Sequence, residues 1–402
     1  GWYSAIPYAR TVDSEKEPNA MANQTPLKHF TLALVLSAPL VLGGGPKVSK
    51  DLKTGNAEDT VNIIVTYRVP PQDADLQKVA KKGGQAKALL ASVKGAVVTA
   101  QRKTLDDIAS DDNVTYVAQD RRVHNSADYA AQASGVQTLY TTGWTGQGIG
   151  VAVIDSGISN HPDLVDPATG KSRVVYQESF IPGNANTDDH YGHGTHVAGI
   201  IGGNGKSSSD KNSTVTIRGI APDVRLLYLR VLDDQGAGQD SWVIAAIERA
   251  IALKAQYNVR IINLSLGRPV FESYKDDPLC QAVEAAWKAG IVVVTAAGNY
   301  GRDNSWGSQG YGTIASPGND PYAITVGAMK TNSTPSRADD TIASYSSKGP
   351  SLIDHVVKPD LVAAGNSIVS LESTGNYLYK NWPSTQTPHG YYQSNGDQKP
   401  SD

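Results

Sequence analysis

The sequence has a single cysteine, no large excess of charge and no apolar run long enough to span a bilayer. These three absences narrow the class of protein to which it can belong. The single cysteine, Cys280, cannot form an internal disulfide, and its helical context favours a buried apolar role over a reactive thiol. A net charge of −3 argues against a general nucleic-acid or membrane-surface role. With 402 residues, 40% hydrophobic residues and 39 glycines, the chain suits an α/β protein with one large core and a smaller domain.

The longest apolar run, residues 30–42, is too short for a spanning helix and is typical of a secretory signal. Lys28 precedes it and three glycines, residues 43–45, follow it. We therefore expect translation to start at Met21, a signal peptide over residues 21–45, and a non-native upstream segment over residues 1–20. The predicted location is secreted, or extracellular. A buried or disordered apolar tail stays open as the alternative.

Residues 59–123 show the pattern strand, helix, strand, helix, strand, which predicts a small α+β, ferredoxin-like domain. The expected strands cover residues 61–65, 96–98 and 113–117, and the expected helices cover residues 74–93 and a short stretch that Thr104 would cap. An unrelated ferredoxin-like domain is the alternative to the interpretation as a propeptide given below.

Residues 124–402 alternate strands with helices, which predicts an α/β domain with a mostly parallel sheet and helices on both faces. Strands are expected over residues 150–154, 224–231, 260–266, 291–296 and 322–326. Helices are expected over residues 241–254, with Asp240 or Ser241 as cap, and over residues 278–289. The glycines at 146, 148 and 150 precede a strand instead of following one, so we interpret them as a turn and not as a nucleotide site.

Asp155 follows four apolar β-formers, which places a carboxylate at the carboxyl end of a buried strand, where the charge needs a partner. His193 can supply it: the carboxylate accepts the Nδ1 hydrogen, fixes the tautomer and stabilises the imidazolium. The small residues after His193 let a helix start beneath the site, and His196 would point toward the interior. A metal site is not favoured, because these two histidines have no convincing third ligand and the H-E-x-x-H pattern is missing.

The segments V-A-V-I-D-S-G, residues 151–157, and H-G-T-H-V-A-G, residues 193–199, resemble the Asp and His segments of the subtilisin-like serine proteases, or subtilases. The order Asp then His also matches this family. The resemblance covers residues 61–371. It implies peptide-bond hydrolysis through an Asp, His and Ser triad, polypeptide substrates, no required cofactor, and an inhibitory propeptide at residues 59–123.

The resemblance also implies further site residues. Asn299, in the segment V-T-A-A-G-N, resembles the asparagine of the family's oxyanion hole. Two segments resemble the pair between which a substrate lies as an added strand: Gly236, Ala237 and Gly238, and Ser265, Leu266 and Gly267. Asp163 matches a calcium-ligand position, so calcium is possible as a structural ion, and a surface aspartate is the alternative. Neither nucleic acid nor, after export, a membrane is an expected partner.

The family's G-T-S-M-A segment is missing from residues 1–402. Ser384 has a proline four residues later, Pro388, but Trp382 and Pro383 replace the expected Gly and Thr before it. We therefore do not assign Ser384 as the nucleophile and expect an incomplete catalytic domain over residues 124–402, inactive and poorly folded alone, with one sheet face uncovered. Two other hypotheses remain: a pseudoprotease that binds extended peptides, and a structural extracellular domain.

Overall fold

The computed structural model describes residues 47–125, 136–305, 307–331, 337–388, 390 and 392–394. The expected signal peptide and upstream segment lie outside these residues. No helix in the described ranges has the length and apolar character needed to cross a membrane.

The first part of the chain contains β1 (Thr60–Tyr67), α1 (Asp73–Lys81), β2 (Gln85–Leu90), β3 (Gly95–Gln101), α2 (Leu105–Ala109), β4 (Val114–Gln119), β5 (Arg122–Asn125) and α3 (Gln137–Thr141). The middle contains β6 (Gly150–Asp155), β7 (Val174–Ser179), α4 (His193–Gly202), β8 (Arg225–Arg230), β9 (Ala237–Gln239), α5 (Asp240–Ala252), α6 (Lys254–Tyr257), β10 (Val259–Leu264) and β11 (Leu266–Gly267). The last part contains α7 (Pro278–Lys288), β12 (Val292–Ala296), β13 (Ile324–Lys330), β14 (Thr341–Ile342), β15 (Leu361–Ala364) and α8 (Tyr377–Asn381).

The N-terminal domain, residues 47–125, is built on an antiparallel sheet of order β2-β3-β1-β4 with α1 and α2 packed against it. The expected helix over residues 74–93 is wrong in its second half. Helix α1 ends before Gly83, whose φ is +82°, and the following residues form β2, which pairs with β3. Thr104 does not cap α2 either, because its hydroxyl donates to the carbonyl of Gln101 at 2.8 Å.

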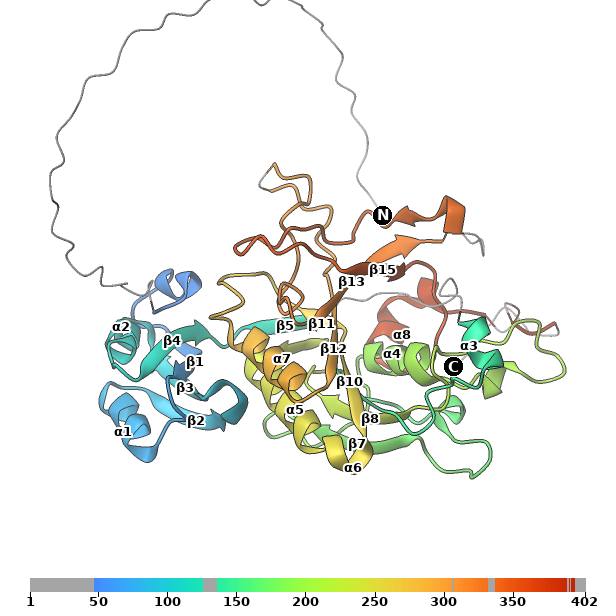
Figure 1. Ribbon diagram of the computed structural model, residues 1–402, viewed down its shortest axis with the longest axis horizontal. Coiled ribbons are helices and arrows are strands. Elements are labelled where there is room, and N and C mark those ends of the chain that lie inside the picture. Colours follow the sequence, from blue (N-terminus) through green and yellow to red (C-terminus); the bar gives the residue numbers. More distant parts are fainter. Residues whose placement is uncertain are drawn as a thin grey trace, which may run out of the picture. The chain divides into compact units, whose positions relative to one another are not determined.

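A large sheet forms the second domain, in the order β14-β13-β12-β10-β6-β8-β7, with β15 also paired to β13 (Figure 1). Every pair is parallel except β13 with β14. Helices α5 and α7 cover one face, and α4 packs against β6 and β8 on the other. This confirms the predicted α/β fold with a mostly parallel sheet.

Part of the α4 side of this sheet is exposed. Val292, Ile324 and Leu361 lie on one face of β12, β13 and β15 by register, and each of these side chains is more than a third exposed. Parallel strands are normally covered on both faces, so this apolar area is unusual for the fold.

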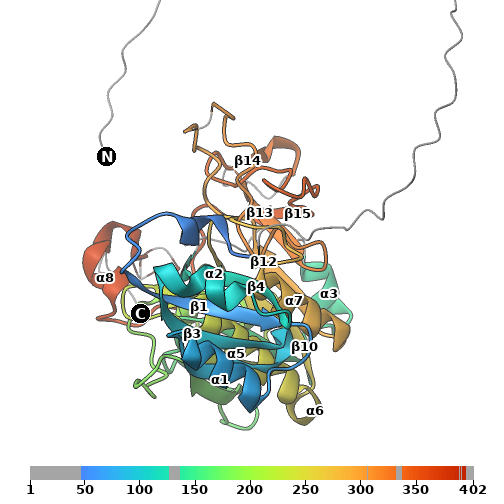
Figure 2. The same ribbon diagram turned by 90° about the vertical axis from the view of Figure 1, so that its left-hand side faces the viewer.

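The two domains are packed together at α5 and α7, as Figure 2 shows. Ile64, Leu90 and Val97 of the N-terminal sheet belong to the same apolar cluster as the buried residues of both helices. The backbone N–H of Ser92 donates to Oε1 of Glu248 on α5 at 2.6 Å. The N-terminal sheet therefore covers two helices that would otherwise face solvent.

Helix α5 begins at Asp240, and its start differs from the sequence-based expectation. Neither Asp240 nor Ser241 caps the helix. Instead, Asp120 of the preceding domain accepts hydrogen bonds from the Ser241 N–H at 2.9 Å and from its hydroxyl at 2.7 Å. A carboxylate is favourable at this end of a helix, because the first N–H groups have no partner within the helix.

Candidate active site

The carboxyl end of β6 carries a buried carboxylate. Asp155 is the last residue of this strand and is fully buried. Its Oδ1 accepts a hydrogen bond from the Ser156 N–H at 2.7 Å and lies 2.8 Å from Nδ1 of His193, while Oδ2 lies 3.0 Å from the same nitrogen. Because a carboxylate only accepts, the proton between them is assigned to Nδ1, so Nε2 is the nitrogen suited to take a proton.

A second buried carboxylate holds the start of α4. Asp189 accepts hydrogen bonds from the backbone N–H groups of Gly192 and Thr195, both at 2.7 Å, and from the hydroxyl of Ser156 at 2.8 Å. Burial raises the pKa of Asp189. It takes the place of an N-cap side chain, because the residue at that position is Gly192. Asp189 was not predicted from the sequence, and the partners of its side chain include groups 33 positions before it and six positions after it.

Close backbone contact explains the glycine after His193. A Cβ on Gly194 would lie 2.2 Å from the carbonyl oxygen of Gly157 and 2.9 Å from the hydroxyl of Tyr228. The Tyr228 hydroxyl also donates to the Gly194 carbonyl. Helix α4 therefore starts directly against the loop that follows Asp155, which keeps the two reactive side chains in contact.

His196 lies one turn further along α4 and is partly buried. Burial, together with the nearby His193, lowers its pKa to about 4. It is therefore a neutral imidazole at physiological pH, which fits the predicted structural role. No group of three or more potential metal-binding side chains (His, Cys, Asp or Glu) occurs within the described ranges.

A cavity opens beside the two histidines of α4. Its lining includes His193, His196, Ile368, Leu371 and Thr387. The same cavity reaches Asp163. Any nucleophile that transfers its proton to His193 has to come within hydrogen-bond reach of this imidazole.

The two predicted substrate segments lie on either side of a third strand. Gly236 precedes β9, and Leu266 and Gly267 form β11, which directly follows Ser265. Between β9 and β11 lies β5, antiparallel to both. Gly236 has a φ of +74°, and a Cβ there would lie 2.6 Å from the Tyr191 ring. The structure thus brings the two predicted segments to either side of β5, and the cleft is the position between β9 and β11 that β5 fills.

The register of this small sheet is defined by five pairs, the first of which joins Arg122 to Gln239. Val123 pairs with Gly238, and His124 pairs with Ala237 on one side and Gly267 on the other. Asn125 pairs with Leu266. Residues 122–125 therefore lie in the cleft as an extended peptide would, with backbone pairing on both edges.

Asn299 follows β12 at the same edge of the sheet as Asp155. Val153, Asn263 and Val294 are paired across three parallel strands, so the ends of β6 and β12 are level. Gly298, just before Asn299, has a φ of +103°, and a Cβ on it would lie 2.8 Å from the Ser347 hydroxyl. This turn places Asn299 beyond the strand end, partly buried.

Three other candidates lie elsewhere. Ser384 is exposed in a short 3-10 turn, Pro383–Thr385, and not at the start of a long buried helix. Cys280 is fully buried, with its Sγ 3.5 Å from Oδ1 of Asn319. The alternative interpretation of Asp163 as a surface aspartate is wrong. Asp163 is 2% exposed, and its Oδ1 accepts a hydrogen bond from the Ser207 N–H at 2.7 Å.

A histidine oriented by a buried carboxylate, beside a cleft that pairs with an extended chain, is the arrangement found in serine hydrolases that act on peptides. The sequence profile of the Subtilase family matches residues 146–397. The chain therefore belongs to this family, the subtilisin-like serine proteases.

Relatives among characterised proteins agree with the family. The chain is 38% identical to serine protease AprX of Bacillus subtilis, over 71% of this chain and 62% of that protein. It is 36% identical to subtilisin E of the same species, over 77% of this chain and 72% of that protein. It is 38% identical to subtilisin of Bacillus pumilus, over 66% of this chain and 82% of that protein.

Proposed function

We propose that this chain is the precursor of a secreted serine endopeptidase. His193 would take the proton of a serine hydroxyl through Nε2 as that oxygen attacks a peptide carbonyl, and would return the proton to the leaving amine. Asp155 would keep Nδ1 protonated and stabilise the imidazolium. Asn299 would donate its side-chain N–H to the developing oxyanion.

The observation that carries this proposal is the contact between His193 and Asp155. Both side chains are buried, at 3% and 0% exposure, and Nδ1 lies within 3.0 Å of both carboxylate oxygens. A histidine placed only for packing would not require a second buried charge beside it. We assign no nucleophile within residues 1–402, so we propose that this stretch by itself does not hydrolyse peptides.

We also propose that residues 47–125 act as an intramolecular inhibitor. Strand β5 fills the cleft between β9 and β11, where a substrate would add as a strand. The N-terminal domain adds an apolar interface with α5 and α7 and the Asp120 cap on α5. An inhibitor bound in this manner would act by occupying the cleft.

The experiment compares two proteins: residues 1–402 and the product of the complete reading frame. Each is incubated with casein and with a fluorophosphonate probe that labels activated serines. We expect hydrolysis and labelling only for the complete product, with the loss of both in its His193→Ala variant. Labelling of a complete product that is insensitive to this substitution would refute the assigned dyad.

A pseudoprotease is the second candidate, and the cleft itself favours it, because backbone pairing between β9 and β11 does not need a nucleophile. In that case the complete product would bind extended peptides without hydrolysing them and would not react with the probe. The same experiment therefore separates the two functions.

Export is the remaining part of the proposal. The signal-like run on which it depends, residues 30–42, lies outside the described residues. N-terminal sequencing of the secreted protein tests it. A mature N-terminus at Gly1 would contradict both the signal peptide and the start at Met21.

A further inference from the structure

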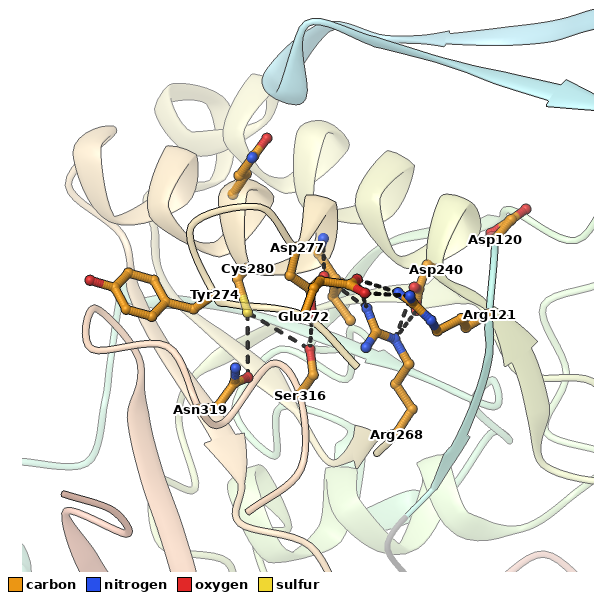
Figure 3. Close-up of polar contacts among 12 residues, drawn as sticks. Asp120, Arg121, Asp240, Arg268, Glu272, Tyr274, Asp277, Cys280, Ser316 and Asn319 are labelled. Carbon is orange, nitrogen blue, oxygen red and sulfur yellow. Dashed lines mark hydrogen bonds and ion pairs between the residues drawn. The ribbon is translucent and has the colours of Figure 1, made fainter. Parts of the chain in front are cut away.

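Arg121 immediately precedes β5, and its side chain is held in a defined site (Figure 3). The side chain is 4% exposed. Its guanidinium donates to both carboxylate oxygens of Glu272 through Nη1 and Nη2. It also donates to Asp51 through Nε at 2.9 Å and Nη2 at 3.1 Å, and lies over the Phe271 ring at 4.8 Å from the centroid. The planar, two-pronged contact with Glu272 suits arginine better than lysine.

Apart from Arg121, Glu272 has one nearby cation, Arg268, which it shares with two other carboxylates. Nη2 of Arg268 lies 3.8 Å from Glu272, but the hydrogen bonds of Arg268 go elsewhere. Its Nε donates to both oxygens of Asp240, at 2.9 and 3.1 Å, and its Nη2 donates to Asp277 at 2.8 Å. Three buried carboxylates therefore surround one guanidinium. Burial and the charge of Asp277 raise the pKa of Glu272 to about 7, against the lowering effect of Arg121 and Arg268.

The partners of Arg121 come from two different parts of the chain. Asp51 belongs to the N-terminal domain and would leave the site together with Arg121 if that domain dissociated. Glu272 and Phe271 follow β11 and would remain. The site that remains has an acceptor pair for a guanidinium and an aromatic face on which it can stack.

We propose that Glu272 and Phe271 form a subsite that binds an arginine side chain of an extended polypeptide lying in the cleft. The register defines its position: Arg121 is two residues before Val123, the residue paired with Gly238. A substrate or inhibitor with arginine at this position would bind more tightly than the same peptide without it. The subsite recognises a residue beyond the backbone-paired stretch, so it adds sequence preference to a cleft that otherwise contacts the main chain.

This inference rests on the proposed function, because it needs a cleft that accepts extended peptides. Asp120 gives the same strand a second anchor, since it caps α5 through Ser241. Adjacent acidic and basic residues before the paired stretch are therefore the expected recognition feature. The N-terminal domain carries both, which fits its proposed role as an inhibitor.

The test uses the mature form of the complete gene product and a fluorescein-labelled peptide with the sequence of residues 120–125, Asp-Arg-Arg-Val-His-Asn. Binding is followed by fluorescence anisotropy. Citrulline, which keeps the shape but removes the charge, replaces the first arginine in one peptide and the second arginine in a matched control. We expect the first replacement to weaken binding about 30-fold, the ratio expected when one partner of a buried charge pair is removed, and the second less than about threefold.

A protein variant, combined with the peptide substitution, completes a double-mutant cycle. In Glu272→Gln the arginine and first-citrulline peptides should bind within about threefold of each other, because the carboxylate that distinguishes them is gone. Equal binding of these two peptides to the unsubstituted protein would overturn the arginine subsite and leave the proposed peptide-binding cleft intact. Failure of every peptide to bind would overturn the cleft and the subsite together. The peptide series does not depend on how well the variant folds.

Discussion

The Asp155–His193 dyad and the interface charge cluster, which consists of Arg121, Arg268, Glu272, Asp240 and Asp277, both bury charge almost completely. They differ in where their partners come from. The dyad is supported by Ser156 and by the Asp189 network, all within the α/β domain. The cluster is closed by Arg121, which belongs to the segment that enters the cleft.

This difference has a physical consequence. Charges whose partners lie within one domain stay paired in every state in which that domain is folded. Charges whose partners lie in two segments lose pairing when those segments separate, and an unpaired buried charge is costly. The geometry of the dyad is therefore expected to stay constant. The pairing of charges in the cluster is expected to depend on whether a basic segment lies in the cleft.

The largest expected effect comes from breaking the dyad. In the complete gene product, Asp155→Asn should lower kcat/KM toward a peptide substrate by about 10⁴-fold, because an amide no longer holds the required tautomer of His193. Steady-state hydrolysis of a fluorogenic peptide measures it. Asp188→Asn, at an exposed carboxylate nearby, should leave the rate within about twofold. A loss of less than tenfold in Asp155→Asn would contradict the assigned role.

Breaking the cluster should affect stability. In residues 1–402, Arg121→Met should lower the free energy of unfolding by about 3–5 kcal/mol, because Glu272 then remains buried without its cation. Urea denaturation gives this value. Arg225→Met removes an exposed arginine and should change the same quantity by less than about 0.5 kcal/mol.

A double substitution sharpens this prediction. In Arg121→Met with Glu272→Met, both charges are removed and the free energy of unfolding should recover most of the loss. Equal losses in the single and double variants would show that Arg121 acts through packing and not through its charge.

The pH dependence of stability should show the contribution of His196. Its pKa falls from 6.5 to about 4 on folding because the neutral form is favoured in the interior. The folded state therefore resists protonation, so this contribution is present above pH 6.5 and is lost as the pH falls through about 4. It amounts to about 3 kcal/mol.

Urea denaturation of residues 1–402 at pH 7, 5.5 and 4, repeated for His196→Gln, isolates this term as the difference between the two pH profiles. Other groups titrate over the same range but contribute to both profiles. Parallel profiles would mean that His196 is not held neutral.

The smallest effect is expected at an exposed ion pair. Lys288 Nζ lies 2.7 Å from Oε2 of Glu284 on the surface of α7, a distance as short as those in the cluster. Glu284→Gln should lower the free energy of unfolding by only about 0.3–0.5 kcal/mol, because solvent screens the pair. If Glu284→Gln lowers the free energy of unfolding as much as Arg121→Met does, burial does not determine how much an ion pair contributes.

Much of the fold could be predicted from local patterns. The apolar stretches that became β6 and β8 are buried on both faces, which leaves continuous hydrophobic runs in the sequence. Strands β10 and β12 are mostly apolar as well, although each has an exposed position. Three strands of the large sheet were missed: β7, β15 and the two-residue, exposed β14. Strand β7 is partly exposed along its length, and β15 is a four-residue strand beside an exposed edge, so neither has a strong apolar signal. Strand β2 was missed because five of its six residues are exposed.

The candidate site divides in the same way. Asp155 and His193 stand in local contexts that predict their chemistry: a carboxylate after a buried strand, and a histidine among small residues at a helix start. Asp189 was missed because its partners, Ser156 and Thr195, lie on either side of it at distances that no short motif describes.

The local sequence predicted most of the alternating strands and helices, because each depends on residues close together in the chain. The pairing of Asp155 with His193 and the two segments beside β5 came from the family resemblance, which local motifs carry. Tertiary structure alone decided that Asp120 caps α5 and that Arg121 meets Glu272, 151 positions further along. It also decided that β5 enters the cleft. These contacts join segments that the chain brings together only when both domains have folded, so no local periodicity or motif encodes them.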